Sequence, residues 1–194
     1  LAYFATSLLE IDDHEDGEPV RVGGLISRVS TSSDRKGNPM AFVTLEDLSG
    51  KADIVFFSDA YANCKHLVVQ DEVVLVEGRL NRRNGTMSVQ AEEAIPMEHT
   101  RERLTRSVNV ALPYDAVSED LLGQLRSLCA LHEGRCDLLI HLRGADETTG
   151  RDAVIRSRSI RVKPTDELLR AVDTLPGSER AWLTALPPHA RLRA

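Results

Sequence analysis

The chain has 194 residues, a formal net charge of −6 and 42% hydrophobic residues, which is typical of a globular protein with one large or two small domains. No apolar run approaches the roughly 20 residues that cross a bilayer, and Leu1–Glu10 does not have the pattern of a signal peptide, so we expect no contact with a membrane. Because the chain begins at Leu1 rather than at methionine, we expect a fragment or a processed chain.

The N-terminal segment, residues 1–18, is predicted to be an arm followed by a linker. Leu1–Ile11 is weakly apolar and fits either a short helix or a packed arm. Asp12–Glu18 (DDHEDGE) is acidic and contains a glycine, which is typical of a connecting segment.

Five strand-like segments follow, in which apolar and polar residues alternate with a period of two. Gly23-Gly24 within the first strand indicates a sharp bend, and Asn84-Gly85 predicts the turn of a hairpin. Ser58 is expected to cap a helix that runs to about Leu67. The predicted strands are Val20–Thr31, Pro39–Leu48, Lys51–Phe57, Glu72–Leu80 and Thr86–Ile95.

The order of these elements, β-β-β-α-β-β over residues 19–97, predicts a five-stranded oligonucleotide-binding (OB) barrel. The bend in the first strand fits the closure of a small barrel. Barrels of this kind usually bind nucleic acid or sugar on one face, so the predicted fold narrows the function.

The rest of the chain differs in composition. Glu98–Arg106 is a charged linker, and we expect strands at 107–112, 136–142 and 152–162, with helices at 117–132 and 164–175. This β-α-β-β-α order predicts a small α+β domain over residues 107–186, of the split βαβ or KH-like type. Residues 187–194 are expected to form a loose tail. The predicted fold class is therefore a β barrel followed by an α/β domain.

Positive charge is placed unevenly on the predicted barrel. Arg35 and Lys36 lie in the first inter-strand loop, and Arg82 and Arg83 lie in the loop between the last two strands. These loops flank the binding face of an OB barrel, which predicts a cationic cleft for a phosphate backbone; the alternative is that hairpin tips of any protein favour charged residues. The predicted nucleic-acid-binding residues are Arg28, Arg35, Lys36, Phe42, Lys51, Arg79, Arg82 and Arg83.

The phenylalanines of the barrel are candidates for stacking on bases. Phe56 and Phe57 are neighbours on a strand and face opposite ways, so at most one of them belongs to the core. Phe42 shares a face with Thr44 and Glu46, which predicts exposure and a possible platform for a base. Packing in the core is the alternative for each phenylalanine.

We find no motif of a hydrolase, a phosphate-binding loop, a zinc protease or a calcium site. Cys64, Cys129 and Cys136 show no CxxC spacing, so we expect buried thiols in a reducing, cytoplasmic compartment. We therefore expect no catalytic residue, no metal and no cofactor. A basic strand end (Arg156, Arg158, Arg161 and Lys163) fits a partner or nucleic-acid contact and a solvated strand face equally well.

Two runs, VRVGGLISRVSTSSDRKGNPMAFVTLEDLSGKADIVFFSDAY and VVLVEGRLNRRNGTMSVQAEEAIPM, resemble the OB domain near the C-terminus of the bacterial DNA polymerase III alpha subunit. The features that carry the resemblance are Val22-Gly23-Gly24, Gly37 with Pro39-Met40-Ala41-Phe42, Leu45-Glu46-Asp47 with Gly50, Phe57, and Val76-Glu77-Gly78-Arg79. The second half, with a leucine-rich helix, Gly134 and Arg161-Val162-Lys163-Pro164, resembles the C-terminal domain of that subunit. The similarity covers about Pro19 to Leu183.

The resemblance implies a binding and tethering module, because the family's catalytic carboxylates lie upstream of this region. It implies that the OB domain binds single-stranded DNA template and that the C-terminal domain binds the tau subunit of the clamp loader during DNA replication; contact with the sliding clamp stays open. The fragment itself is then not an enzyme, whereas its parent is a DNA-directed DNA polymerase, a nucleotidyltransferase.

Two other classes of function remain. The net charge of −6 and an aromatic content of 4% favour a protein-interaction scaffold whose barrel does not bind nucleic acid. The general OB pattern also fits an anticodon-binding domain of a tRNA synthetase.

Overall fold

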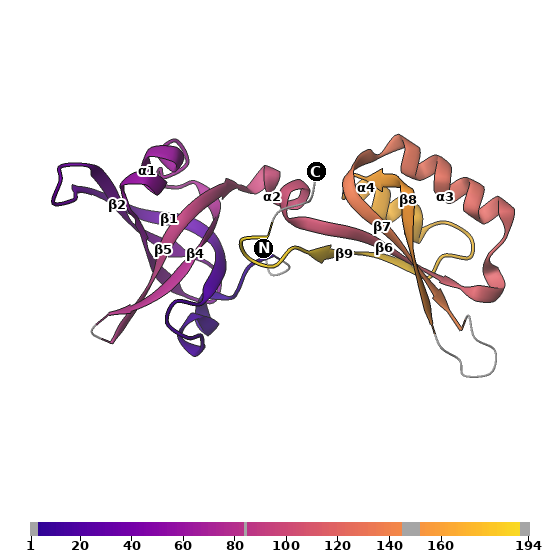
Figure 1. Ribbon diagram of the computed structural model, residues 1–194, viewed down its shortest axis with the longest axis horizontal. Helices are drawn as coiled ribbons and strands as arrows, with labels where there is room; N and C mark the ends of the chain where they lie inside the picture. The colour runs from indigo at the N-terminus through magenta and orange to yellow at the C-terminus, as the bar shows by residue number, and fades with distance from the viewer. Residues whose placement is uncertain (1–3, 84, 145–151, 191–194) are drawn as a thin grey trace. The chain divides into compact units, whose positions relative to one another are not determined.

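The computed structural model describes residues 4–83, 85–144 and 152–190. It contains two compact units (Figure 1): the first comprises residues up to Thr100 together with Pro187–Ala190, and the second comprises Arg101–Leu186. Asn84 of the predicted hairpin turn lies outside the described residues. No helix in these ranges is long and apolar enough to span a membrane.

The first unit is a closed barrel with strand order β1-β2-β3-β5-β4. β3 and β5 pair in parallel, and the other neighbours pair antiparallel. This confirms the predicted five-stranded barrel with a helix after the third strand. Its elements are η1 (Leu8–Asp13), β1 (Pro19–Ser33), β2 (Pro39–Glu46), β3 (Lys51–Phe56), α1 (Ser58–Cys64), β4 (Val73–Arg83) and β5 (Thr86–Pro96).

Strand β1 closes the barrel because its first part, Pro19–Leu25, pairs with β4 and its second part, Leu25–Ser33, pairs with β2. Gly24 lies where the strand changes partner. A Cβ atom on Gly24 would lie 2.3 Å from the carbonyl oxygen of Glu46 on β2. The bend predicted from the paired glycines is therefore a place where only a residue without a side chain lets two backbones approach.

Gly78 on β4 makes a second close approach, at a bulge against β5. A Cβ atom there would lie 2.3 Å from the carbonyl oxygen of Gln90, so we expect Gly78→Ala to lower the free energy of unfolding by about 1–3 kcal/mol. Urea denaturation followed by circular dichroism measures the change. Gly50→Ala is the matched control, because its nearest atoms are 3.9 Å away; equal losses in both variants would contradict the steric explanation.

The outer surface of β1 and β4 is covered by both ends of the described chain. Thr6 forms a parallel β-bridge with β1. The carbonyl oxygen of Pro187 accepts a hydrogen bond from the Arg21 guanidinium at 3.2 Å, and the ring of His189 lies 3.1 Å from the carbonyl oxygen of Gly78. The segment expected to begin a loose tail therefore returns to the barrel.

A buried ion pair joins β1 to β4 beneath these segments. The side chains of Arg21 and Glu77 are 2% and 1% exposed, and Nε of Arg21 donates to Oε1 of Glu77 at 2.8 Å. A second guanidinium nitrogen donates to the carbonyl oxygen of Phe4 at 3.3 Å.

The second unit is a four-stranded sheet of order β8-β7-β6-β9, with helices α3 (Glu119–Leu131) and α4 (Asp166–Asp173) on one face (Figure 1). Both helices begin two residues later than predicted, at Glu119 and Asp166, and the side chains of Ser118 and Thr165 cap them by accepting from backbone N–H groups. Helix α2 (Met97–Leu104) begins in the first unit and ends in the second. The elements that follow it are β6 (Thr105–Pro113), η2 (Tyr114–Ala116), α3 (Glu119–Leu131), β7 (Glu133–Arg143), β8 (Ala153–Val162), α4 (Asp166–Asp173) and β9 (Arg180–Ala185).

The sequence-based description of this unit needs two additions. Strand β9 pairs antiparallel with β6 and adds a fourth strand to the predicted β-α-β-β-α order, so the split βαβ or KH-like description is not confirmed. Helix α2 occupies most of the segment expected to be a charged linker, residues 98–106. The coarser prediction, a second sheet with helices, is confirmed.

The three cysteines are buried, as predicted, and form no disulfide with any described residue. Burial raises the pKa of Cys129 and of Cys136 to about 11, so both thiols stay protonated at neutral pH. Among the residues that the structure describes, no three His, Cys, Asp or Glu side chains are grouped so as to hold a metal ion.

Candidate nucleic-acid interface

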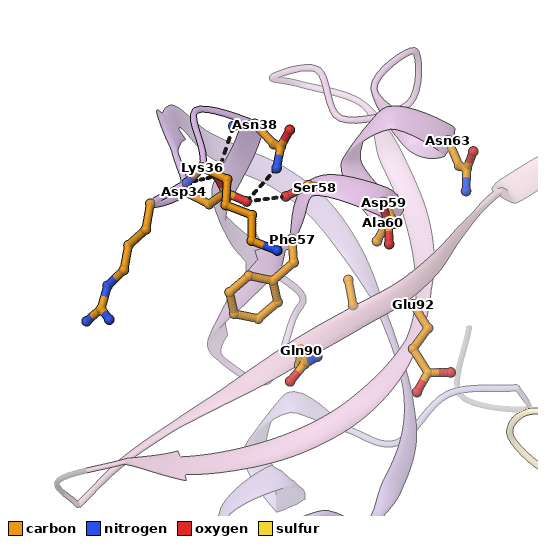
Figure 2. Close-up of a pocket in the computed structure, with 12 residues that line it drawn as sticks. Asp34, Lys36, Asn38, Phe57, Ser58, Asp59, Ala60, Asn63, Gln90 and Glu92 are labelled. Atoms are coloured by element: carbon orange, nitrogen blue, oxygen red, sulfur yellow. Dashed lines mark hydrogen bonds between the residues drawn. The ribbon is translucent and has the colours of Figure 1, made fainter.

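The β1–β2 and β4–β5 hairpins extend beyond the barrel in the same direction in Figure 1. Figure 2 shows Phe57 and Gln90 between them, on the outer surface of the barrel. The arrangement matters for the predicted cationic cleft, because hairpins on opposite sides of the barrel would not share one ligand.

A groove of about 730 Å³ lies between the β1–β2 loop, the beginning of α1 and the outer face of β5 (Figure 2). We call it the barrel groove. It combines two cations and an aromatic ring with three amides and three carboxylates. These side chains are Arg35, Lys36, Phe57, Asn38, Asn63, Gln90, Asp34, Asp59 and Glu92.

Asp34 fixes the shape of the loop that carries the two cations. Its carboxylate accepts hydrogen bonds from the backbone N–H groups of Lys36 and Asn38 at 2.8 and 2.9 Å and from the Asn38 amide at 2.9 Å. These bonds, that from the Asn38 side chain foremost, hold the pKa of Asp34 at about 2, so the carboxylate is ionised at neutral pH. Gly37 completes the turn with a left-handed φ of 84°.

The same carboxylate joins the loop to helix α1. The hydroxyl of Ser58 donates to Asp34 at 3.0 Å (Figure 2). The prediction that Ser58 caps this helix is wrong, because the N-cap position belongs to Phe57, which makes no side-chain capping bond. The hydroxyl of Ser58 instead holds the cationic loop against the helix start.

Arg35 and Lys36 are exposed, and neither forms an ion pair with any residue that the structure describes. Their side chains are therefore available to an anionic ligand, while their backbone is held by Asp34. Of the predicted site residues, these two line the barrel groove.

The exposed fraction of each phenylalanine shows which of the three predicted candidates lie in the core and which lie on the surface. Phe56 is fully buried, whereas Phe57 and Phe42 are each 46% exposed. Adjacent Phe56 and Phe57 thus face opposite ways, as expected. Phe57 lines the groove, while Phe42 lies two strands from Gln90 in a row of cross-strand partners through Val55.

Arg82 and Arg83, which the sequence grouped together, are separated by the strand geometry. Arg83 pairs with Thr86 and shares its face with Arg79, whose partner is Gln90. Arg82 faces the other way: its guanidinium donates to the carbonyl oxygen of Asp12 at 3.0 Å. Arg82 is therefore tied to the acidic N-terminal segment and not brought to the groove.

The remaining predicted cations lie on strands. Arg28 is exposed on the outer face, in a row with Thr44. Lys51 pairs with Glu46 at 2.6 Å, and Arg79 pairs with Glu92 at 3.1 Å. Both pairs are solvent-exposed, which makes them weak, but their positive charge is already compensated.

The sequence reasoning did not assign the other polar and aromatic residues of the groove to a site: Asp34, Asn38, Phe57, Ser58, Asp59, Asn63, Gln90 and Glu92. A signal was present for Asp34, because Asp followed by Gly and Asn is typical of a turn in which the carboxylate accepts backbone N–H groups. None was present for Gln90, since its position depends on the pairing of β5 with β3.

Comparison with known proteins agrees with this geometry. Residues 20–97 match the tRNA anti-codon family model, described as an OB-fold nucleic acid binding domain. The match agrees with the closed five-stranded barrel, so the first unit has the OB fold.

The chain is also similar to DNA polymerase III subunit alpha. It is 31% identical over 165 residues to that protein from Pseudomonas aeruginosa, a match that covers 84% of this chain and 14% of the relative. It is 26% identical over 179 residues to that from Escherichia coli O157:H7, with 91% and 15% covered. The chain is thus homologous to a segment of this subunit and spans about one seventh of its length.

Among solved structures, asparaginyl-tRNA synthetase from Pyrococcus horikoshii aligns with a TM-score of 0.40 and 19% identity, over 49% of this chain and 23% of the other. A likeness of this degree says nothing about what either protein binds.

Proposed function

We propose that this chain is a non-catalytic, C-terminal segment of a replicative DNA polymerase III alpha subunit, and that its OB barrel binds single-stranded DNA. The homology to that subunit supports the identity of the parent. The observation that supports single-stranded DNA as the ligand is the barrel groove, where two unpaired cations on a rigid loop lie beside an exposed aromatic ring.

In this proposal the groove binds the groups that all single strands share, which are the phosphates and the flat faces of the bases. Arg35 and Lys36 contact phosphates, while Arg28 and Arg83 extend the positive surface along the outer face. Phe57, with Phe42 further along, offers a flat apolar surface to a base. Contacts to the backbone and to base faces carry little sequence information, which suits a template whose sequence varies.

In the same proposal, a smaller contribution to DNA binding comes from Lys51, Arg79 and Arg82. Each already has a protein partner, so a phosphate must displace a carboxylate or a carbonyl oxygen before it is bound. We therefore place them at the margin of the DNA site.

We expect Arg35→Gln/Lys36→Gln to weaken binding of a labelled oligothymidylate and to reduce the dependence of affinity on salt. Each lost phosphate contact on a single strand lowers the slope of log K against log salt by about 0.7, so the double variant should lose about 1.4. Fluorescence anisotropy at two salt concentrations measures both quantities.

The matched control is Arg126→Gln/Arg170→Gln, which removes the same charge from exposed positions on α3 and α4. If the groove variant kept the wild-type affinity and slope, the protein-interaction scaffold would become the better account. Tighter binding of the matching RNA strand would favour the anticodon-binding alternative.

We also propose, from the resemblance alone, that the second unit binds the tau subunit of the clamp loader. Support for this comes from the similarity of residues 107–186 to the corresponding part of the alpha subunit. A pull-down of the chain with purified tau tests it separately from the DNA titration.

A further inference from the structure

The sheet of the second unit has one face that its helices do not cover. Cross-strand partners share a face, and the register places Asn109 of β6 opposite Trp182 of β9 and opposite Leu139 of β7. Helices α3 and α4 lie on the other side of the sheet (Figure 1). We call the surface that carries Asn109, His141 and Trp182 the open sheet face.

An aromatic platform lies at the centre of the open sheet face. The rings of His141 and Trp182 are 4.7 Å apart between centroids, at an interplanar angle of 45°. The guanidinium carbon of Arg180 lies 4.7 Å from the centroid of the Trp182 ring, which is a favourable cation–π distance. Three flat groups thus lie next to one another across β7 and β9.

Asn109 holds this platform in place from the strand between. Its side chain is 2% exposed. Its amide nitrogen donates to the Thr184 hydroxyl at 3.0 Å, and its amide oxygen lies 3.0 Å from Nε2 of His141. Burial, and then Arg143, lower the pKa of His141, so at neutral pH its ring is uncharged and donates from Nε2 to this oxygen.

Positive charge surrounds the platform. By register, the described strands place four arginines on this face, Arg143, Arg156, Arg161 and Arg180, together with Asp137. The charge of Arg143 is compensated by Asp152 at 3.2 Å and Glu179 at 3.6 Å. Arg156 pairs with Asp137 at 3.1 Å. Arg161 and Arg180 form no ion pair with a described residue.

We propose that the open sheet face is a second binding site for single-stranded nucleic acid, in which bases stack on the platform of His141, Trp182 and Arg180 and phosphates contact Arg156 and Arg161. A row of flat groups bordered by cations matches a ligand that repeats a planar base and a negative charge. An acidic peptide would use the charges but not the flat groups. The site does not depend on the barrel groove.

Trp182 supplies a probe for this site, because it is the sole tryptophan of the sequence. In the complete chain, oligothymidylate should quench Trp182 emission in a saturable, salt-sensitive manner. Arg156→Gln/Arg161→Gln should weaken the quenching curve and lower its salt slope by about 1.4, at about 0.7 for each phosphate. Arg126→Gln/Arg170→Gln, on the helices, should change neither.

Further arms separate this site from the barrel. Arg35→Gln/Lys36→Gln should leave the Trp182 quenching curve unchanged. The effect of this variant on the barrel groove is measured by anisotropy instead. Each proposal can therefore fail without the other. Absence of quenching in the wild-type chain would overturn the inference. So would quenching that disappears with the barrel variant, or equal quenching by polyglutamate, which would assign the face to an acidic protein partner.

Discussion

Replacing Glu77 by alanine should lower the free energy of unfolding of the barrel by about 3–5 kcal/mol, because it leaves the Arg21 guanidinium charged and buried without its carboxylate. Arg21 is 2% exposed and lies under both ends of the described chain, so water cannot easily replace the lost partner. Urea denaturation followed by circular dichroism measures the loss.

Two further variants make this result specific. Glu46→Ala removes the carboxylate of the exposed pair with Lys51, and its expected cost is much smaller, because water replaces the partner of an exposed charge. Arg21→Met/Glu77→Leu removes both buried charges, and it should recover much of the stability that the single change loses. A loss for Glu77→Ala no larger than that for Glu46→Ala would show that the buried pair is not held as described.

Phe57→Ala should weaken single-stranded DNA binding by about 1–3 kcal/mol, the usual worth of one aromatic side chain stacked on a base, which is roughly a 5- to 150-fold rise in Kd. The ring is 46% exposed and lines the groove. Since Phe57 makes no side-chain capping bond to α1, its removal should leave the helix start intact. Anisotropy of a labelled oligothymidylate measures the change.

Phe42→Ala is the comparison, because that ring is equally exposed but lies outside the groove lining. We expect a smaller loss of affinity from it. If Phe42→Ala weakened binding and Phe57→Ala did not, the stacking surface would lie further along β2, where the sequence first suggested it. No loss in either variant would remove stacking from the proposal.

The barrel could be predicted because its signals are local. Alternation of apolar and polar residues, Gly23-Gly24 and the turn residues before Thr86 each act within a few positions of the chain. The general location of the cationic loops followed from the fold. The Arg21–Glu77 pair could not be foreseen, since it depends on the register between strands 56 positions apart in the sequence.

Other errors share this cause. Two adjacent arginines look equivalent in a sequence, yet the pleat of β4 directs Arg82 to the N-terminal segment and Arg83 to the outer face. Arg180–Ala185 is short and follows a helix, so nothing local showed that it joins a sheet. In each case the outcome was decided by residues distant in the chain.

The return of Pro187 to Arg21 has a consequence for how this protein is made. All strands of the barrel are translated before Thr100. The carbonyl oxygen of Pro187, which accepts a hydrogen bond from Arg21, is made only after all of β6 to β9. On the ribosome, where domains generally fold as units during synthesis, the strands of the barrel are available before this last partner is. The guanidinium group of Arg21 must therefore wait, partly hydrated, until Pro187 has been translated.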